Sequence, residues 1–155
     1  MKKILFLTLC AATIIGCSKT KLSKRQASSW YVSLATTECF GKCPVYQIET
    51  KGDGSSSLLA LRFMEKQGRY TGQFPADSMS ALIGVVQTSD WESYKGEYLT
   101  GYSDLPSTIL RYSITPGDTF GVRFESDRAP IELQRVANLL KHGEKTIDWK
   151  KVAAN

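Results

Sequence analysis

The chain has 155 residues, of which 20 are Lys or Arg and 15 are Asp or Glu, so its formal net charge is +5. No basic stripe with interleaved aromatic residues runs along it, which excludes nucleic-acid binding from the expected functions. The length fits one domain that buries its own core, and the sequence contains neither a glycine-rich phosphate loop nor a solenoid-type repeat.

The first segment has the layout of an export signal. Lys2 and Lys3 form a positive start, residues 4–15 are apolar, and Gly16 precedes Cys17. A helix over 4–15 spans roughly 18 Å, well short of the ~30 Å hydrocarbon core of a bilayer, so a permanent transmembrane helix is not expected. Residues 1–16 are therefore predicted to be a signal peptide.

Residues 14–17 (IIGC) resemble a bacterial lipoprotein box, in which the cysteine is acylated and the chain is then cleaved in front of it. The resemblance implies a palmitate-type lipid anchor on Cys17, and two or three acyl chains there give stable membrane attachment. Cys10 does not fit, because the bulky Leu9 precedes it. The alternatives are an ordinary secretory signal with an incidental cysteine, or a buried helix.

Residues 17–29 are predicted to be a flexible basic tether, because serine, threonine and basic residues dominate them. The basic residues either favour anionic lipid head groups or simply keep the tether soluble. Residues 18–21 lack the acidic cluster that resembles a surface-export tag in some bacteria. The predicted location is therefore the cell envelope, at the outer membrane and facing the periplasm.

Residues 30–150 are predicted to form a single α+β domain. Apolar residues alternate with polar ones in 30–35, 45–50, 59–63 and 70–74, which predicts four strands separated by turns at 52–54 and 67–68. Residues 79–86 then place apolar side chains at helical spacing, and Pro75 and Asp77 suit the entrance of that helix.

The second half of the domain repeats the change of period. Residues 110–114 and 120–124 alternate as strands, and 133–140 returns to helical spacing after Pro130, with Gly143 at the expected C-terminal stop. Hairpin-length connections make neighbouring strands antiparallel, and each helix has one apolar side. The predicted fold is a single antiparallel sheet of about six strands, in the order ββββαββα, with two helices packed on one face.

Cys39 and Cys43 are the cysteines that remain once the signal and the acylated Cys17 are set aside. The compartment outside the inner membrane is oxidising, so we expect a disulfide, worth only about 2 kcal/mol for so small a ring. A thiol or copper-handling role is the alternative, because soft thiolates suit Cu(I) and thioredoxin-like copper-delivery proteins carry a similar motif. The cysteines of those proteins precede a helix, whereas residues 45–50 here predict a strand. Free thiols are the third alternative.

The loop at 91–106 is the predicted place for a ligand, because it combines aromatic rings with carboxylates. Flat rings beside acidic groups suit sugars or peptides, and long loops often carry binding surfaces. The alternative is that the rings complete the core. The candidate ligand-binding residues are Trp91, Tyr98, Tyr102 and Asp104.

His142 is the one histidine in the sequence, so a nucleophilic site with a histidine base has to use it. Its position in the last turns of the second helix favours interaction with the helix dipole instead. One histidine and two paired cysteines also fall short of a usual zinc ligand set. We therefore predict no catalytic residues, no metal and no cofactor.

Residues 39–46 (CFGKCPVY) resemble a segment of a bacterial, often lipid-anchored family known only as a domain of unknown function. Further features in register are Gly52–Gly54, Gly68, Pro75, residues 102–108, Pro130 and Trp149. The resemblance covers about residues 30–149 and implies a single domain, but it brings no reaction. The expected function is a non-catalytic binding or structural role, with the membrane and an envelope protein or glycan as partners.

Overall fold

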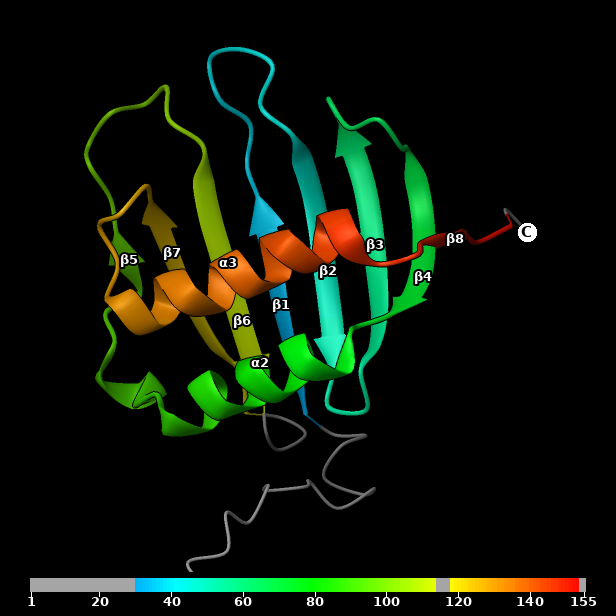
Figure 1. Cartoon of the computed structure of the whole chain (residues 1–155). Helices are drawn as coiled ribbons and strands as arrows, with labels where there is room; N and C mark the ends of the chain where they lie inside the picture. The colour runs from blue at the N-terminus through cyan, green and yellow to red at the C-terminus, as the bar shows by residue number, and fades with distance from the viewer. Residues whose placement is uncertain (1–29, 114–117, 154–155) are drawn as a thin grey trace, which may run out of the picture.

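Residues 30–113 and 118–153, which the computed structural model describes, form one sheet with two helices lying across the same face (Figure 1). The predicted signal peptide, Cys17, the tether and residues 114–117 lie outside the described residues. The strands are β1 (Tyr31–Thr36), β2 (Val45–Lys51), β3 (Ser55–Arg62), β4 (Gly68–Gln73), β5 (Glu97–Tyr98), β6 (Ser107–Ser113), β7 (Phe120–Glu125) and β8 (Lys150–Lys151). The helices are α2 (Ala76–Thr88) and α3 (Ile131–Thr146), and η1 (Trp91–Ser93) is a 3-10 turn.

The predicted sheet is wrong in its strand count and in being purely antiparallel. The described residues form an eight-stranded sheet in the order β5-β7-β6-β1-β2-β3-β4-β8. β5 pairs with β7 in parallel, with Glu97 opposite Arg123, so the sheet is mixed. β8 adds to β4 at the other edge. Two-residue strands carry no readable period, which is why the sequence pattern showed only the six longer ones.

The core lies between the sheet and the two helices, as the alternating pattern requires. In β2, for example, Tyr46, Ile48 and Thr50 are buried, whereas the residues between them are only half-buried. Each helix contributes one apolar stripe; these are Met79, Leu82 and Val86 of α2, and Leu133, Val136, Ala137 and Leu140 of α3. Burying a side chain of this size contributes about 1.5–3 kcal/mol, so this core dominates the stability of the fold.

Both helices begin after a proline and without a side-chain cap. The carbonyl oxygen of Pro75 accepts a hydrogen bond from Met79 N at 2.8 Å, and that of Pro130 accepts one from Gln134 N at 3.2 Å. Asp77 lies in the first turn of α2, where its charge complements the helix dipole. Among the described residues, no helix has the length and apolar character needed to cross a bilayer.

Gly143 does not end α3, contrary to the prediction; the helix continues to Thr146. Gly143 is buried and faces the ring of Phe74, the residue that follows β4. A Cβ at position 143 would lie 3.0 Å from Phe74 Cζ and closer still to Cε2. The glycine is therefore required by close packing of helix against sheet, and the helix ends three residues later.

One end of the sheet carries the loop that contains Cys39 and Cys43. β1 starts beside Trp30, runs the length of the sheet, and leads into residues 37–44, the loop that projects beyond the strands in Figure 1. β2 starts and β3 ends beside this loop, since Val45 pairs with Arg62. β6 also starts here and β7 ends here, since Ser107 pairs with Glu125. We call this the disulfide end.

Candidate functional site

A cleft of about 750 Å³ opens at the disulfide end, between the ends of the strands and the second half of α3. Its walls come from the end of β1, residues 43–46, residues 63–66 after β3, residues 106–108 and Ser126. Lys141, Glu144 and Lys145 of α3 complete it. This volume lies in the range of small-molecule sites, about 300–1,000 Å³.

A disulfide joins Cys39 to Cys43, with a Cα–Cα separation of 5.8 Å, which confirms the predicted pairing. Cys43 lines the cleft, and the bridge fixes the loop that forms one of its walls. Phe40, within this small ring, is 94% exposed, and its N–H donates to the carbonyl oxygen of Asp104 at 3.2 Å. The disulfide loop and the 91–106 loop are thereby tied together.

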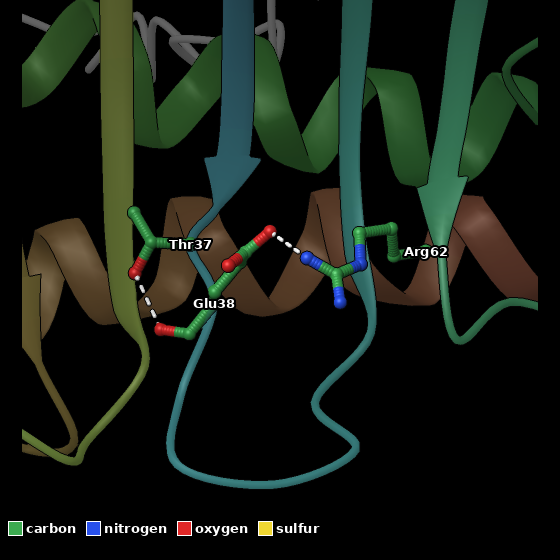
Figure 2. Close-up of polar contacts among 3 residues, drawn as sticks. All are labelled: Thr37, Glu38 and Arg62. Atoms are coloured by element: carbon green, nitrogen blue, oxygen red, sulfur yellow. Dashed lines mark hydrogen bonds and ion pairs between the residues drawn. The ribbon is translucent and has the colours of Figure 1, made fainter.

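An ion pair between Glu38 and Arg62 spans the base of the disulfide loop (Figure 2). The Thr37 hydroxyl donates to the carbonyl oxygen of Glu38 at 3.3 Å. Arg62 also lies over the ring of Phe63, with Cζ 5.2 Å from the ring centroid. Both charged side chains are exposed, so the pair contributes at most about 1 kcal/mol and acts mainly to position the cleft wall.

Backbone strain is concentrated at the cleft. Among the described residues, the non-glycine residues with positive φ are Phe63, at 56°, and Ser126, at 47°. Both line the cleft. Residues other than glycine rarely adopt this backbone conformation, and strained residues of this kind cluster at binding and active sites.

A network of hydrogen bonds around the buried Glu125 carboxylate, which we call the rim network, holds the neighbouring loops. Thr100 donates to it from its backbone N–H at 2.8 Å and from its hydroxyl at 2.6 Å. The Ser107 hydroxyl donates at 3.4 Å and itself accepts from Arg123 Nε at 3.1 Å. These donors, those of Thr100 first, lower the pKa of Glu125 below its ordinary value of 4.5.

Three of the polar residues that line the cleft are at least half-buried and belong to β2 or α3: Tyr46, Lys141 and Glu144. In the described part of the chain, no hydrogen bond or ion pair engages the Tyr46 hydroxyl, the Lys141 ammonium or the Glu144 carboxylate. Burial raises the pKa of Tyr46 to about 12, and the charge of Glu144 adds to the shift. Burial also lowers the pKa of Lys141 and raises that of Glu144.

The four predicted ligand-binding residues are not brought together. Trp91 is 7% exposed, stacks on Tyr112 at 4.7 Å between ring centroids, and donates from Nε1 to the carbonyl oxygen of Val86 at 2.9 Å. Tyr98 is half-buried, and its hydroxyl accepts from Lys95 N at 3.1 Å.

Two of the four residues lie in the exposed part of the same loop. Tyr102 is 67% exposed, and Asp104 is exposed beside Phe40 at the disulfide end. Trp91 instead contacts Tyr112, which pairs with Val32 near the start of β1, at the opposite end of the sheet. A common role for the four residues in ligand binding stays a prediction.

Sequence reasoning missed the side chains that make up the cleft. Lys141 and Glu144 flank the apolar stripe of α3, where charged residues are ordinary, and Tyr46 belongs to a segment that predicts only a strand. Nothing in their spacing distinguishes them from other residues of a strand or a helix flank. Among the described residues, no group of three or more His, Cys, Asp or Glu side chains is arranged to hold a metal ion.

The comparisons with known proteins identify a family for this chain. Residues 31–142 match the family DUF6438, described as a domain of unknown function. The matched segment runs from β1 to His142 and so includes the disulfide, the 91–106 loop and Lys141. A search of curated proteins finds no match.

Proposed function

Since the chain belongs to the DUF6438 family, a domain of unknown function, we propose its function from its geometry: a non-catalytic binding domain that holds a small ligand in the cleft. One observation carries the proposal, the presence of a hydroxyl, an ammonium and a carboxylate in the cleft without protein partners. Partly burying a polar group is costly unless a partner compensates it. A bound ligand supplies those partners.

The walls of the cleft support this proposal, because they are fixed before any ligand arrives. The disulfide closes the loop on one side, the Glu38–Arg62 ion pair spans its base, and the rim network around Glu125 holds the opposite loop. Rigid walls reduce the entropy that is lost when a ligand binds. Residues held at positive φ on two sides of the cleft fit the same interpretation.

We further propose that the domain is attached to the outer membrane through lipid on Cys17 and faces the periplasm. The lipoprotein-box resemblance of residues 14–17 supports the anchor, and the Cys39–Cys43 disulfide suits an oxidising compartment. β1 begins directly after the predicted tether in the sequence and ends at the disulfide end, so the cleft lies at the other end of β1 from its first residue, Tyr31.

The exposed part of the 91–106 loop favours a second candidate, a glycan- or peptide-binding surface beside the cleft. Tyr102 and Phe40 present exposed rings, and Asp104, in the same loop as Tyr102, accepts the hydrogen bond from Phe40 N through its carbonyl oxygen. Exposed aromatic rings next to a carboxylate suit sugar or peptide contact. Because the ring of Trp91 is covered, this surface is limited to the disulfide end.

The binding proposal is tested with the full-length protein purified in detergent and a panel of amino acids, dipeptides, oligosaccharides and nucleotides. A ligand for the cleft should raise the unfolding temperature by a few degrees, in proportion to its concentration. Met64→Trp narrows the cleft and should remove the shift, whereas Gln87→Trp on the exposed face of α2 should keep it. A shift that survives Met64→Trp would contradict the cleft as the binding site.

A further inference from the structure

Two charges of opposite sign stand one helical turn apart on the cleft side of α3. Lys141 and Glu144 are three residues apart, so their Cβ atoms are about 5–6 Å from each other. Both are half-buried, yet no ion pair joins them to each other or to a third group in the described part of the chain. The helix therefore presents a separate cationic and a separate anionic group to the same cavity.

The cleft lining carries further charges of both signs around this pair. Lys145 and Lys66 act on Glu144 as attractive charges and Glu65 as a repulsive one, and all three also line the cleft. A purely anionic ligand such as a nucleotide would meet Glu65 and Glu144 beside the lysines. A purely cationic ligand would meet the three lysines. A ligand with one charge of each sign avoids both conflicts.

The remaining lining adds an apolar region and a hydrogen-bonding group. Phe63 and Met64 after β3 and Pro106 before β6 contribute apolar residues to the lining. The Tyr46 hydroxyl lies near enough to Glu144 for the carboxylate to act on its pKa, so it can bind the same part of a ligand. A neutral sugar would leave both charges without a charged partner, which makes it the poorer fit.

We propose that the cleft binds a small zwitterionic ligand of the dipeptide class, with its carboxylate at Lys141, its amine at Glu144 and Tyr46, and an apolar side chain against Phe63 and Met64. The spacing suits this class, because two residues at full extension span roughly 7 Å, which is similar to the about 5–6 Å between the Cβ atoms of the two helix positions. This inference rests on the binding function proposed above and names its ligand class.

The test is calorimetric titration of the full-length protein in detergent with leucyl-leucine in four forms. These are the free dipeptide, its N-acetyl form, its C-terminal amide and the form blocked at both ends. The variants are Lys141→Met and Glu144→Gln, which keep the side-chain length. Lys95→Met and Glu92→Gln are matched controls, because both residues are exposed and lie outside the cleft.

The free dipeptide should bind, and each block should weaken binding at least about tenfold, since a charge-assisted hydrogen bond is lost. Lys141→Met should weaken the free and N-acetyl forms but not the amide. Glu144→Gln should weaken the free form and the amide but not the N-acetyl form. The control variants should leave every affinity within about twofold.

The outcomes separate this inference from the function on which it rests. Equal binding of the free and blocked dipeptides, or binding that neither cleft variant alters, overturns the zwitterion assignment and leaves a binding cleft in place. Binding of neutral oligosaccharides alone does the same. If neither the dipeptides nor any solute of the wider panel binds, both the ligand class and the binding function are wrong.

Discussion

Glu125 and Glu144 are two carboxylates at the disulfide end whose surroundings shift the pKa in opposite directions. Glu125 accepts hydrogen bonds from Thr100 and Ser107, which stabilise its charged form and lower its pKa. Glu144 has no such donor in the described part of the chain, and burial raises its pKa. The first carboxylate stabilises the fold when ionised, and the second destabilises it.

We expect Glu125→Gln and Glu144→Gln to change stability with opposite signs. A folded-state pKa below the ordinary 4.5 gives stability that is present above pH 4.5 and lost as the pH falls through the folded value, so Glu125→Gln should destabilise at neutral pH. A raised folded-state pKa means that the charged form opposes folding above it, so Glu144→Gln should stabilise at neutral pH. The Glu125→Gln difference should shrink as the pH falls below 4.5, whereas the Glu144→Gln difference should disappear earlier, as the pH falls from the raised pKa of Glu144 to 4.5.

Urea unfolding of each variant and of the natural protein across this pH range measures the effect. Glu92→Gln is the control, because Glu92 is exposed and outside the rim network, and it should stay within about 0.5 kcal/mol throughout. A loss of stability in Glu144→Gln at neutral pH would mean that this carboxylate has a protein partner after all. It would then not be available to a ligand.

At this scale the sequence predicted one part of the candidate site and missed another. The Cys39–Cys43 pair could be predicted, because two nearby cysteines in a chain that carries a predicted export signal have few other uses. Lys141 and Glu144 were not, because a charge on a helix flank is ordinary until the tertiary structure places a cavity next to it. Glu125 ends a strand, and only the folding back of residues 99–106 supplies its donors.

At the scale of elements, the packing of α3 against the strand side of the core depends on one glycine. Gly143→Ala gains helix propensity worth about 1 kcal/mol, but the added methyl group must displace the buried ring of Phe74. Overpacking of this kind costs about 1–3 kcal/mol, so we expect net destabilisation of up to about 2 kcal/mol.

Gly84→Ala in α2 is the matched control, because no atom lies within 4 Å of the position where its Cβ would stand. It should stabilise the protein by about 0.5–1 kcal/mol from helix propensity alone. Thermal and urea unfolding of the two variants give the comparison. Equal stabilisation by both substitutions would show that α3 can shift away from Phe74 without loss.

The elements themselves were predictable where a period of several residues was available. The six longer strands and the two helices carry such periods, because one face of each packs into a shared core. β5 and β8 do not, because two residues cannot show alternation, and their pairing depends on distant strands. The end of α3 was misplaced because Gly143 was read as a stop rather than as a packing contact.

At the scale of the whole molecule, the proposed attachment through Cys17 makes a direct prediction. Cys17→Ser should move the protein from the membrane fraction to the soluble fraction or leave it unprocessed, because serine has no thiol to acylate. Cell fractionation and mass spectrometry of the amino terminus measure both outcomes.

Cys10→Ser is the control for this experiment and should change nothing, because Leu9 precedes Cys10 where a small residue is needed. If Cys17→Ser stays fully membrane-bound with the natural amino terminus, attachment must have another cause. The binding cleft is unaffected by that result, since it is built entirely from residues 36–145.

The two edge strands of the sheet, β5 and β8, affect how easily neighbouring copies of the domain can associate. An edge strand with a long row of unpaired backbone N–H and C=O groups can pair with the edge strand of a neighbouring copy. Here the edge strands β5 and β8 have only two residues each. Both residues of β8 are lysines, whose positive charges repel the same edge strand of a second copy. If many copies are crowded on a membrane through the proposed lipid anchor, these short edge strands should therefore oppose edge-to-edge assembly into fibrils.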